Sequence, residues 1–144
     1  MTKKVENNIL IPEMASLLCE GKDVRFTPTG VSMRPFIEGG SDVVVLRKLP
    51  QVRVGDISLA AIGQSFVLHR VIAVEGDKVT LLGDGNIGYS EHCTTADILG
   101  TVIRIENAQG RRKPLTRGRL WFYIRPCRRI LLKIYRKLLK FGLI

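Results

Sequence analysis

Residues 66–82 read FVLHRVIAVEGDKVTLL, two apolar and β-branched runs that meet at a short polar turn. β-Branched residues favour strands, and Glu75-Gly76-Asp77-Lys78 is typical of a hairpin turn between two of them. Similar short runs, separated by Gly, Asp and Pro, extend on both sides without a long helix between them. We therefore expect a mainly β fold built as a coiled barrel. The expected strands are 24–28, 42–47, 56–62, 66–75, 78–82 and 97–105.

Helical patterns are confined to the two ends of the chain. Near the start, Pro12 suits a first helical turn and Gly21 can end the helix, which predicts a short helix over residues 11–20. Near the end, basic and apolar residues recur at helical spacing on different faces, which predicts a basic amphipathic helix. A polar, basic stretch precedes it. The expected organisation is a folded domain at 1–106, a linker at 107–118 and a tail at 119–144.

The net charge of +10 belongs to the tail. Residues 111–144 contain 12 of the 23 Lys and Arg residues and no acid, whereas residues 1–110 hold 11 basic and 13 acidic residues. A helix with one basic and one apolar face suits an anionic membrane surface, on which residues 120–144 would lie without crossing it. The alternative is that its apolar face packs on the barrel and its charges remain solvated.

Cysteine usage and the start of the chain exclude several classes of protein. The three cysteines, Cys19, Cys93 and Cys127, are odd in number and far apart, so we expect no disulfide framework. His92 beside Cys93 lacks further ligands nearby, and we expect neither a metal nor a small-molecule cofactor. The start shows no signal-peptide pattern, and no run of ~20 apolar residues follows. We therefore expect a protein of the cytoplasm or of the cytoplasmic membrane face.

Three short blocks carry the chemistry. They are TGVSMRPF at 29–36, LHRVIAVEGD at 68–77 and LGDGN at 82–86. In this order they resemble the motifs of the signal peptidase I family: a Gly-x-Ser-Met-x-Pro box, a basic residue followed by Arg-Val-x-x-x-x-Gly-Asp, and a Gly-Asp-Asn-like box. The resemblance covers about residues 9–105. It implies a β-barrel of the signal-peptidase and LexA-like superfamily, and a serine endopeptidase that cleaves signal or leader peptides.

The resemblance makes Ser32 the nucleophile and His69 its general base. A hydroxyl is a weak nucleophile until a base removes its proton, and neutral imidazole can do this near pH 7. Bacterial housekeeping members have lysine at the base position, so the histidine is similar to the catalytic subunit of the ER signal peptidase and to archaeal relatives. Gly30, Val31 and Met33 would shape the turn and support the oxyanion. Because Gly30 replaces a serine found in some members, the oxyanion would depend on backbone N–H groups.

A histidine base needs a third group that fixes its tautomer and stabilises the imidazolium. Asp84, in the Gly-Asp-Gly-Asn box, is the first choice. Relatives commonly have further acids soon after this box, whereas this chain offers Glu91 or Ser90 as the alternative. Arg70 follows His69 directly and should point to the opposite face of the strand, which predicts a structural ion pair rather than a catalytic role.

Two other classes of function compete with the peptidase. A self-cleaving repressor of the LexA type shares the superfamily, but such proteins use lysine as the base and carry a DNA-binding domain, and only about thirty residues precede Ser32. A non-catalytic module could instead hold nucleic acid or membrane through its basic tail. The paired Ser32 and His69 count against a purely binding role. A peptide or precursor protein is therefore the expected partner, and nucleic acid is the less favoured one.

Overall fold

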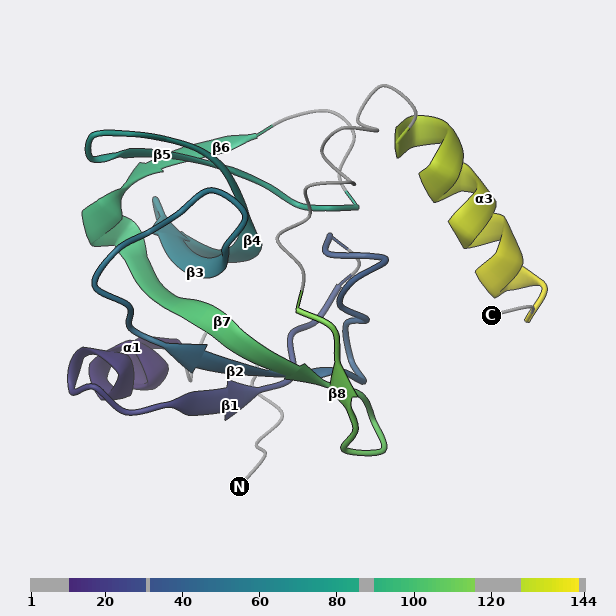
Figure 1. Ribbon diagram of the computed structural model, residues 1–144, viewed down its shortest axis with the longest axis horizontal. Helices are drawn as coiled ribbons and strands as arrows, with labels where there is room; N and C mark the ends of the chain where they lie inside the picture. Colours follow the sequence, from purple (N-terminus) through teal and green to yellow (C-terminus); the bar gives the residue numbers. More distant parts are fainter. Residues whose placement is uncertain (1–10, 31, 86–89, 116–127, 143–144) are drawn as a thin grey trace.

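The computed structural model describes residues 11–30, 32–85, 90–115 and 128–142. Seven strands form one curled antiparallel sheet in the order β1-β2-β7-β3-β4-β5-β6, and an eighth, β8, pairs with β7 (Figure 1). The strands are β1 (Val24–Phe26), β2 (Val43–Arg47), β3 (Ile57–Ile62), β4 (Ser65–Glu75), β5 (Lys78–Leu82), β6 (Glu91–Thr94), β7 (Ile98–Glu106) and β8 (Arg112–Lys113). The helices are α1 (Ile11–Cys19), the 3-10 helix η1 (Thr95–Asp97) and α3 (Arg128–Lys140).

The prediction of a mainly β fold is confirmed. Each of the six expected strands is present, as β1 to β5 and β7, and the expected N-terminal helix is α1. The hairpin turn that joins β4 to β5 is closed by Glu75 opposite Lys78. Gly76 in that turn has a φ of 61°, a conformation that glycine adopts without a steric cost.

Strand β4 is the longest, with 11 residues, and it changes partner along its length. Residues 65–70 pair with β3, whereas pairing with β5 begins at Arg70 and continues to Glu75. On the side away from β3, the stretch 65–69 therefore has no strand partner within the described chain. This open edge lies beside the loop that connects β1 to β2, because both line the same cleft.

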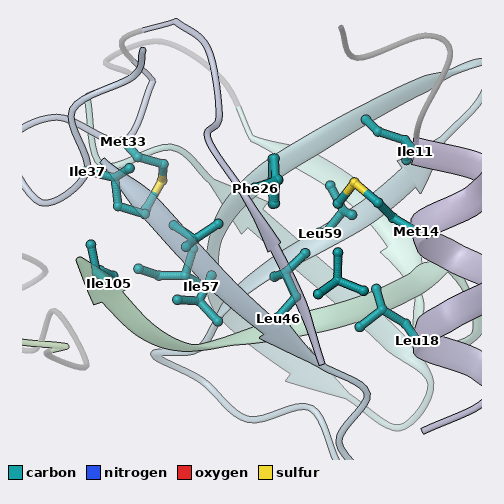
Figure 2. Packing of buried hydrophobic residues seen from close by; sticks show 13 residues of the cluster. Ile11, Met14, Leu18, Phe26, Met33, Ile37, Leu46, Ile57, Leu59 and Ile105 are labelled. Carbon is teal, nitrogen blue, oxygen red and sulfur yellow. The ribbon is translucent and has the colours of Figure 1, made fainter. Parts of the chain in front are cut away.

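The main core joins the sheet to α1 and to the β1–β2 loop. Figure 2 shows Ile11, Met14 and Leu18 of α1 on one side of the buried cluster and Met33 and Ile37 of the loop on the other. All five are at most 4% exposed. Burial of such side chains stabilises by roughly 1.5–3 kcal/mol each. The loop that carries the candidate nucleophile is therefore anchored in the core.

Two strands, β6 and β8, were not expected from the sequence. β6 reads Glu-His-Cys-Thr, which has no run of apolar or β-branched residues, and it lies at the edge of the sheet, where β5 holds it. β8 lies within the stretch 107–118, predicted to be a linker, and pairs with β7 at Ile105 and Glu106. Short polar strands of this kind form because a neighbouring strand offers hydrogen bonds, not because of local preference.

The expected basic amphipathic helix is present as α3, and Figure 1 shows it outside the curled sheet. Leu132 is buried, at 1% exposed, and the guanidinium of Arg136 donates from Nη2 to the Gly85 carbonyl oxygen at 3.4 Å. One side of α3 therefore packs on the domain. Residues 119–127 of the predicted tail lie outside the described chain. Among the helices that the structure describes, none is long and apolar enough to cross a bilayer.

Candidate active site

Ser32 lies in the loop between β1 and β2, where two segments of the loop backbone are in close contact. Gly30 has a φ of 87°, which favours glycine. A Cβ at Gly39 would lie 1.9 Å from the Gly30 carbonyl oxygen, so the two limbs of the loop touch only because residue 39 has no side chain. The N–H of Gly40 also donates to the Pro28 carbonyl at 2.7 Å. These features fit the predicted turn-shaping role of Gly30, whereas Val31 lies outside the described residues.

Two further contacts fix the position of Ser32. Met33 is buried in the core, and its carbonyl oxygen accepts hydrogen bonds from Phe36 N and Ile37 N, both at 3.0 Å, which forms a tight turn directly after the serine. The carbonyl oxygen of Ser32 accepts a 2.7 Å hydrogen bond from the N–H of Gly85. The Gly-Asp-Gly-Asn box thus holds the serine loop through its backbone.

His69 lies on β4 and is almost fully buried, with a carboxylate against its ring. Nδ1 of His69 is 3.0 Å from Oε2 of Glu91. Glu91 is in register with Leu81 of β5, which is in register with Val71 of β4. Val71 and His69 are two residues apart on one strand, so their side chains share a face of the sheet, the face on which Glu91 lies.

The contact with Glu91 determines how the imidazole can react. Because a carboxylate only accepts hydrogen bonds, Nδ1 must carry the proton in this contact. Nε2 of a neutral His69 then has a free lone pair, and no hydrogen-bond partner of Nε2 lies among the described residues. The ring is therefore oriented by one nitrogen and able to accept a proton at the other.

Ser32 and His69 line the same cleft, whose volume is about 160 Å³. Most of the residues that line it have apolar side chains, among them Phe26, Phe66 and Leu68. In the described part of the chain no hydrogen bond joins the two catalytic candidates, and bonds of this kind often tighten only when a substrate is bound. The cleft brings together a hydroxyl, an oriented imidazole and several apolar side chains.

Residues 3–103 match the model of the family described as peptidase S24-like. The matched region is more than two thirds of the chain and contains the serine loop, β4 and the Glu91 strand. The chain belongs to the peptidase S24-like family. No curated protein matches it. This family includes serine peptidases and LexA-like repressors, and the curled sheet with its short helices agrees with membership.

In this S24-like domain, the first choice for the orienting acid is corrected. Nη2 of Arg70 donates to Oδ2 of Asp84 at 2.6 Å, and Nε of Arg70 donates to Oδ1 at 3.1 Å. The acid that contacts His69 is the alternative, Glu91, and neither Asp84 nor Ser90 hydrogen-bonds its ring within the described chain. The physical reason is strand alternation: consecutive residues point to opposite faces, so a carboxylate that pairs with Arg70 lies on the wrong face for His69.

The predicted structural role of Arg70 is confirmed. The Arg70 and Asp84 side chains are 5% and 4% exposed, and Nη1 of Arg70 also donates to the Gly55 carbonyl at 2.9 Å. The guanidinium carbon lies 5.2 Å from the centre of the Phe36 ring, in the serine loop. A buried arginine thus links β4, the Asp84 turn and the serine loop.

Reasoning on the sequence offered Glu91 only as an alternative acid, because nothing local predicts β6, the strand on which it lies. Glu91 is 22 residues from His69, and β6 has no local strand signal. As for metals, the described residues contain no group of three His, Cys, Asp or Glu side chains that could hold an ion. His92 lies beside Cys93 in the sequence, and its Nδ1 is 3.3 Å from the hydroxyl oxygen of Thr80.

Proposed function

We propose that this protein is a serine endopeptidase in which Ser32 is the nucleophile, His69 the general base and Glu91 the group that orients the base. The observation that carries the proposal is the 3.0 Å contact between His69 and Glu91, at a cleft that Ser32 also lines. A carboxylate, an imidazole and a hydroxyl in this order form the arrangement that activates serine in unrelated hydrolases. The finer proposal, from the ordered motifs, is that the substrates are signal or leader peptides.

The proposed reaction has two halves. In the first, Ser32 Oγ attacks the scissile carbonyl carbon as its proton passes to His69 Nε2, and the C–N bond then breaks as the proton passes to the leaving amine. In the second, water attacks the acyl-enzyme with His69 again as the base, and Ser32 leaves with its proton restored. Backbone N–H groups, including that of Ser32, would stabilise the negative oxygen, since residue 30 is glycine.

The open edge of β4 supports an extended peptide as the substrate. The N–H of Val71 donates to the Asp56 carbonyl and its C=O accepts from Gly55 N, so the backbone groups of this residue face β3. Because the direction of these groups alternates along a strand, those of Phe66 and Leu68 face the open edge. A substrate strand could pair there and place its scissile bond toward Ser32.

The size of the cleft favours small side chains next to the cut. Its volume of about 160 Å³ lies below the ~300–1,000 Å³ of pockets that enclose drug-sized ligands. Apolar side chains such as Phe26 and Leu68 line it. We therefore expect cleavage after short apolar residues such as alanine, and poor cleavage after large or charged residues.

The decisive experiment is incubation with a panel of leader peptides that carry small residues before the cut, read by mass spectrometry. We expect Ser32→Ala and His69→Ala each to lower kcat/KM about 10⁴-fold or more, and the double variant to be little worse than either, because the two act as one unit. Matched controls are Ser41→Ala, in the same loop but exposed, and His92→Ala, exposed on β6. Turnover by the Ser32→Ala protein close to that of wild type would refute the assignment.

A further inference from the structure

We propose that α3 is a docking element for an anionic lipid surface, and that it uses the face pointing away from the domain. This outer face consists of the exposed apolar residues Ile130, Ile134 and Phe141 and the exposed lysines Lys133, Lys137 and Lys140. The sequence left open whether the tail packs on the domain or lies on a membrane. The positions of the side chains around α3 allow one helix to do both.

The inner side of α3 is occupied by the domain. Leu132 is buried, and Arg136 reaches the Gly85 carbonyl, in the turn whose N–H holds Ser32. Burial raises the pKa of Tyr135, and the nearby Glu38 carboxylate raises it further. These contacts place the inner side of the helix against the serine loop and the Asp84 turn, so the orientation of the helix is fixed.

The outer face has the composition of an interfacial helix. Ile130, Ile134 and Phe141 are 62%, 50% and 64% exposed. At 100° per residue they fall within about 40° of one another, on the side of the helix opposite Leu132. The three lysines border this apolar stripe on one side, and residues 111–144 contain no acid. An apolar stripe next to a row of cations is typical of helices that lie in the headgroup region of a bilayer.

The charge pattern selects the lipid over the other occupants of such a face. A second copy of the chain would bring its own lysines close to these three, and like charges at short range oppose association. Nucleic acid would satisfy the lysines but would leave the isoleucines and the phenylalanine exposed to water. An anionic lipid surface can bind both groups of side chains, because its headgroups pair with the lysines and its acyl chains contact the apolar side chains. The helix would lie flat: its 13 residues span about 20 Å, less than a hydrocarbon core of roughly 30 Å.

Docking would place the peptidase cleft next to the bilayer, because the inner side of the same helix contacts the turn that holds Ser32. This consequence rests on the proposed peptidase function, whereas the docking does not. Binding to vesicles is measured without any cleavage, so a failure of one proposal is distinguishable from a failure of the other.

The test is sedimentation of the full-length protein with vesicles of phosphatidylglycerol and phosphatidylcholine, compared with phosphatidylcholine alone. We expect the protein to bind the anionic vesicles at low salt. At 1 M salt the binding should be weaker by roughly tenfold or more, because counterions screen the lysines. The apolar variant Ile134→Ser/Phe141→Ser and the triple variant Lys133→Gln/Lys137→Gln/Lys140→Gln should each bind at least about tenfold more weakly.

Two controls match these variants. Val54→Ser removes an apolar side chain that is 54% exposed elsewhere, and Lys22→Gln/Arg47→Gln/Lys78→Gln removes the same net charge from other exposed positions. Both should bind like wild type. Binding lost equally in the controls, no binding to anionic vesicles at low salt, or tighter binding to DNA or RNA than to the vesicles would overturn the proposal. A concentration-dependent dimer in light scattering that the apolar variant abolishes would also overturn it.

Discussion

His69 and Arg70, which are consecutive residues of β4, each pair with a carboxylate. The two pairs differ in their hydrogen bonding and in their exposure to solvent. Nε and Nη2 of Arg70 both donate to the Asp84 carboxylate, and both side chains are at most 5% exposed. His69 and Glu91 are joined by one contact, and Glu91 is 16% exposed. The arginine pair connects three segments of backbone, whereas the histidine pair leaves one ring nitrogen free beside a cleft.

The two pairs are therefore suited to different roles, one structural and the other in the proposed reaction. A guanidinium remains charged at every relevant pH, so the Arg70 pair is permanent and can lock the serine loop in place. A neutral imidazole can accept a proton and return it, which is the role that the proposed mechanism gives to His69. Strand alternation places the arginine pair on one face of β4 and the histidine pair on the other.

The largest expected effect is on stability, when Arg70 is replaced by Met. The Asp84 carboxylate would stay buried without its cation, so we expect the free energy of unfolding to fall by about 3–5 kcal/mol in urea denaturation. Because Arg70→Met/Asp84→Leu leaves no unpaired charge, it should recover much of the loss. The control is Arg34→Met, whose ion pair with Glu38 is more exposed and should contribute less than about 1 kcal/mol. Equal losses at the two arginines would contradict this account.

The next effect is on activity, when Glu91 is replaced by Gln. Loss of the carboxylate leaves the imidazole without a fixed tautomer, so kcat should fall roughly 10²–10⁴-fold in a peptide-cleavage assay. The free energy of unfolding should change by no more than about 1.5 kcal/mol, since the isosteric amide keeps a polar group at the ring and leaves no buried charge unpaired. Glu75→Gln, at the exposed end of β4, is the control and should keep full activity. A fully active Glu91→Gln protein would remove the carboxylate from the proposed mechanism.

A smaller effect is expected in the pH profile. Imidazole is a base only when neutral, so kcat/KM of the wild type should fall on the acid side. A flat profile in the wild type would be inconsistent with His69 as the base.

The smallest effect is expected where α3 meets the Asp84 turn. The hydrogen bond from Arg136 to Gly85 is long, at 3.4 Å, and its donor side chain is exposed. Arg136→Gln should therefore change the free energy of unfolding by less than about 1 kcal/mol and leave kcat/KM within about twofold. If Arg136→Gln lowered the free energy of unfolding as much as Arg70→Met does, α3 would support the site together with the Arg70–Asp84 pair.

Several features of this protein could be predicted from the sequence because they depend on neighbouring residues alone. The alternation of side chains along 66–75 places His69 and Arg70 on opposite faces, and this is why the ion-pair role of Arg70 could be expected. The β-branched runs and their glycine turns located six of the strands. The ordered motifs nominated Ser32 and His69, which the fold places in one cleft.

The identity of the carboxylate that meets His69 was decided only by the tertiary structure. Asp84 is closer in sequence and lies in a recognisable motif, but in the turn after β5 its carboxylate pairs with Arg70. Glu91 reaches the ring because a short polar edge strand pairs with β5 in one particular register. The outward direction of the apolar stripe on α3 likewise depends on which residues the domain buries. The physical reason is the same for both. The register of β6 and the orientation of α3 depend on hydrogen bonds and packing between segments far apart in the chain, and these interactions produce no periodic pattern in the sequence of either segment.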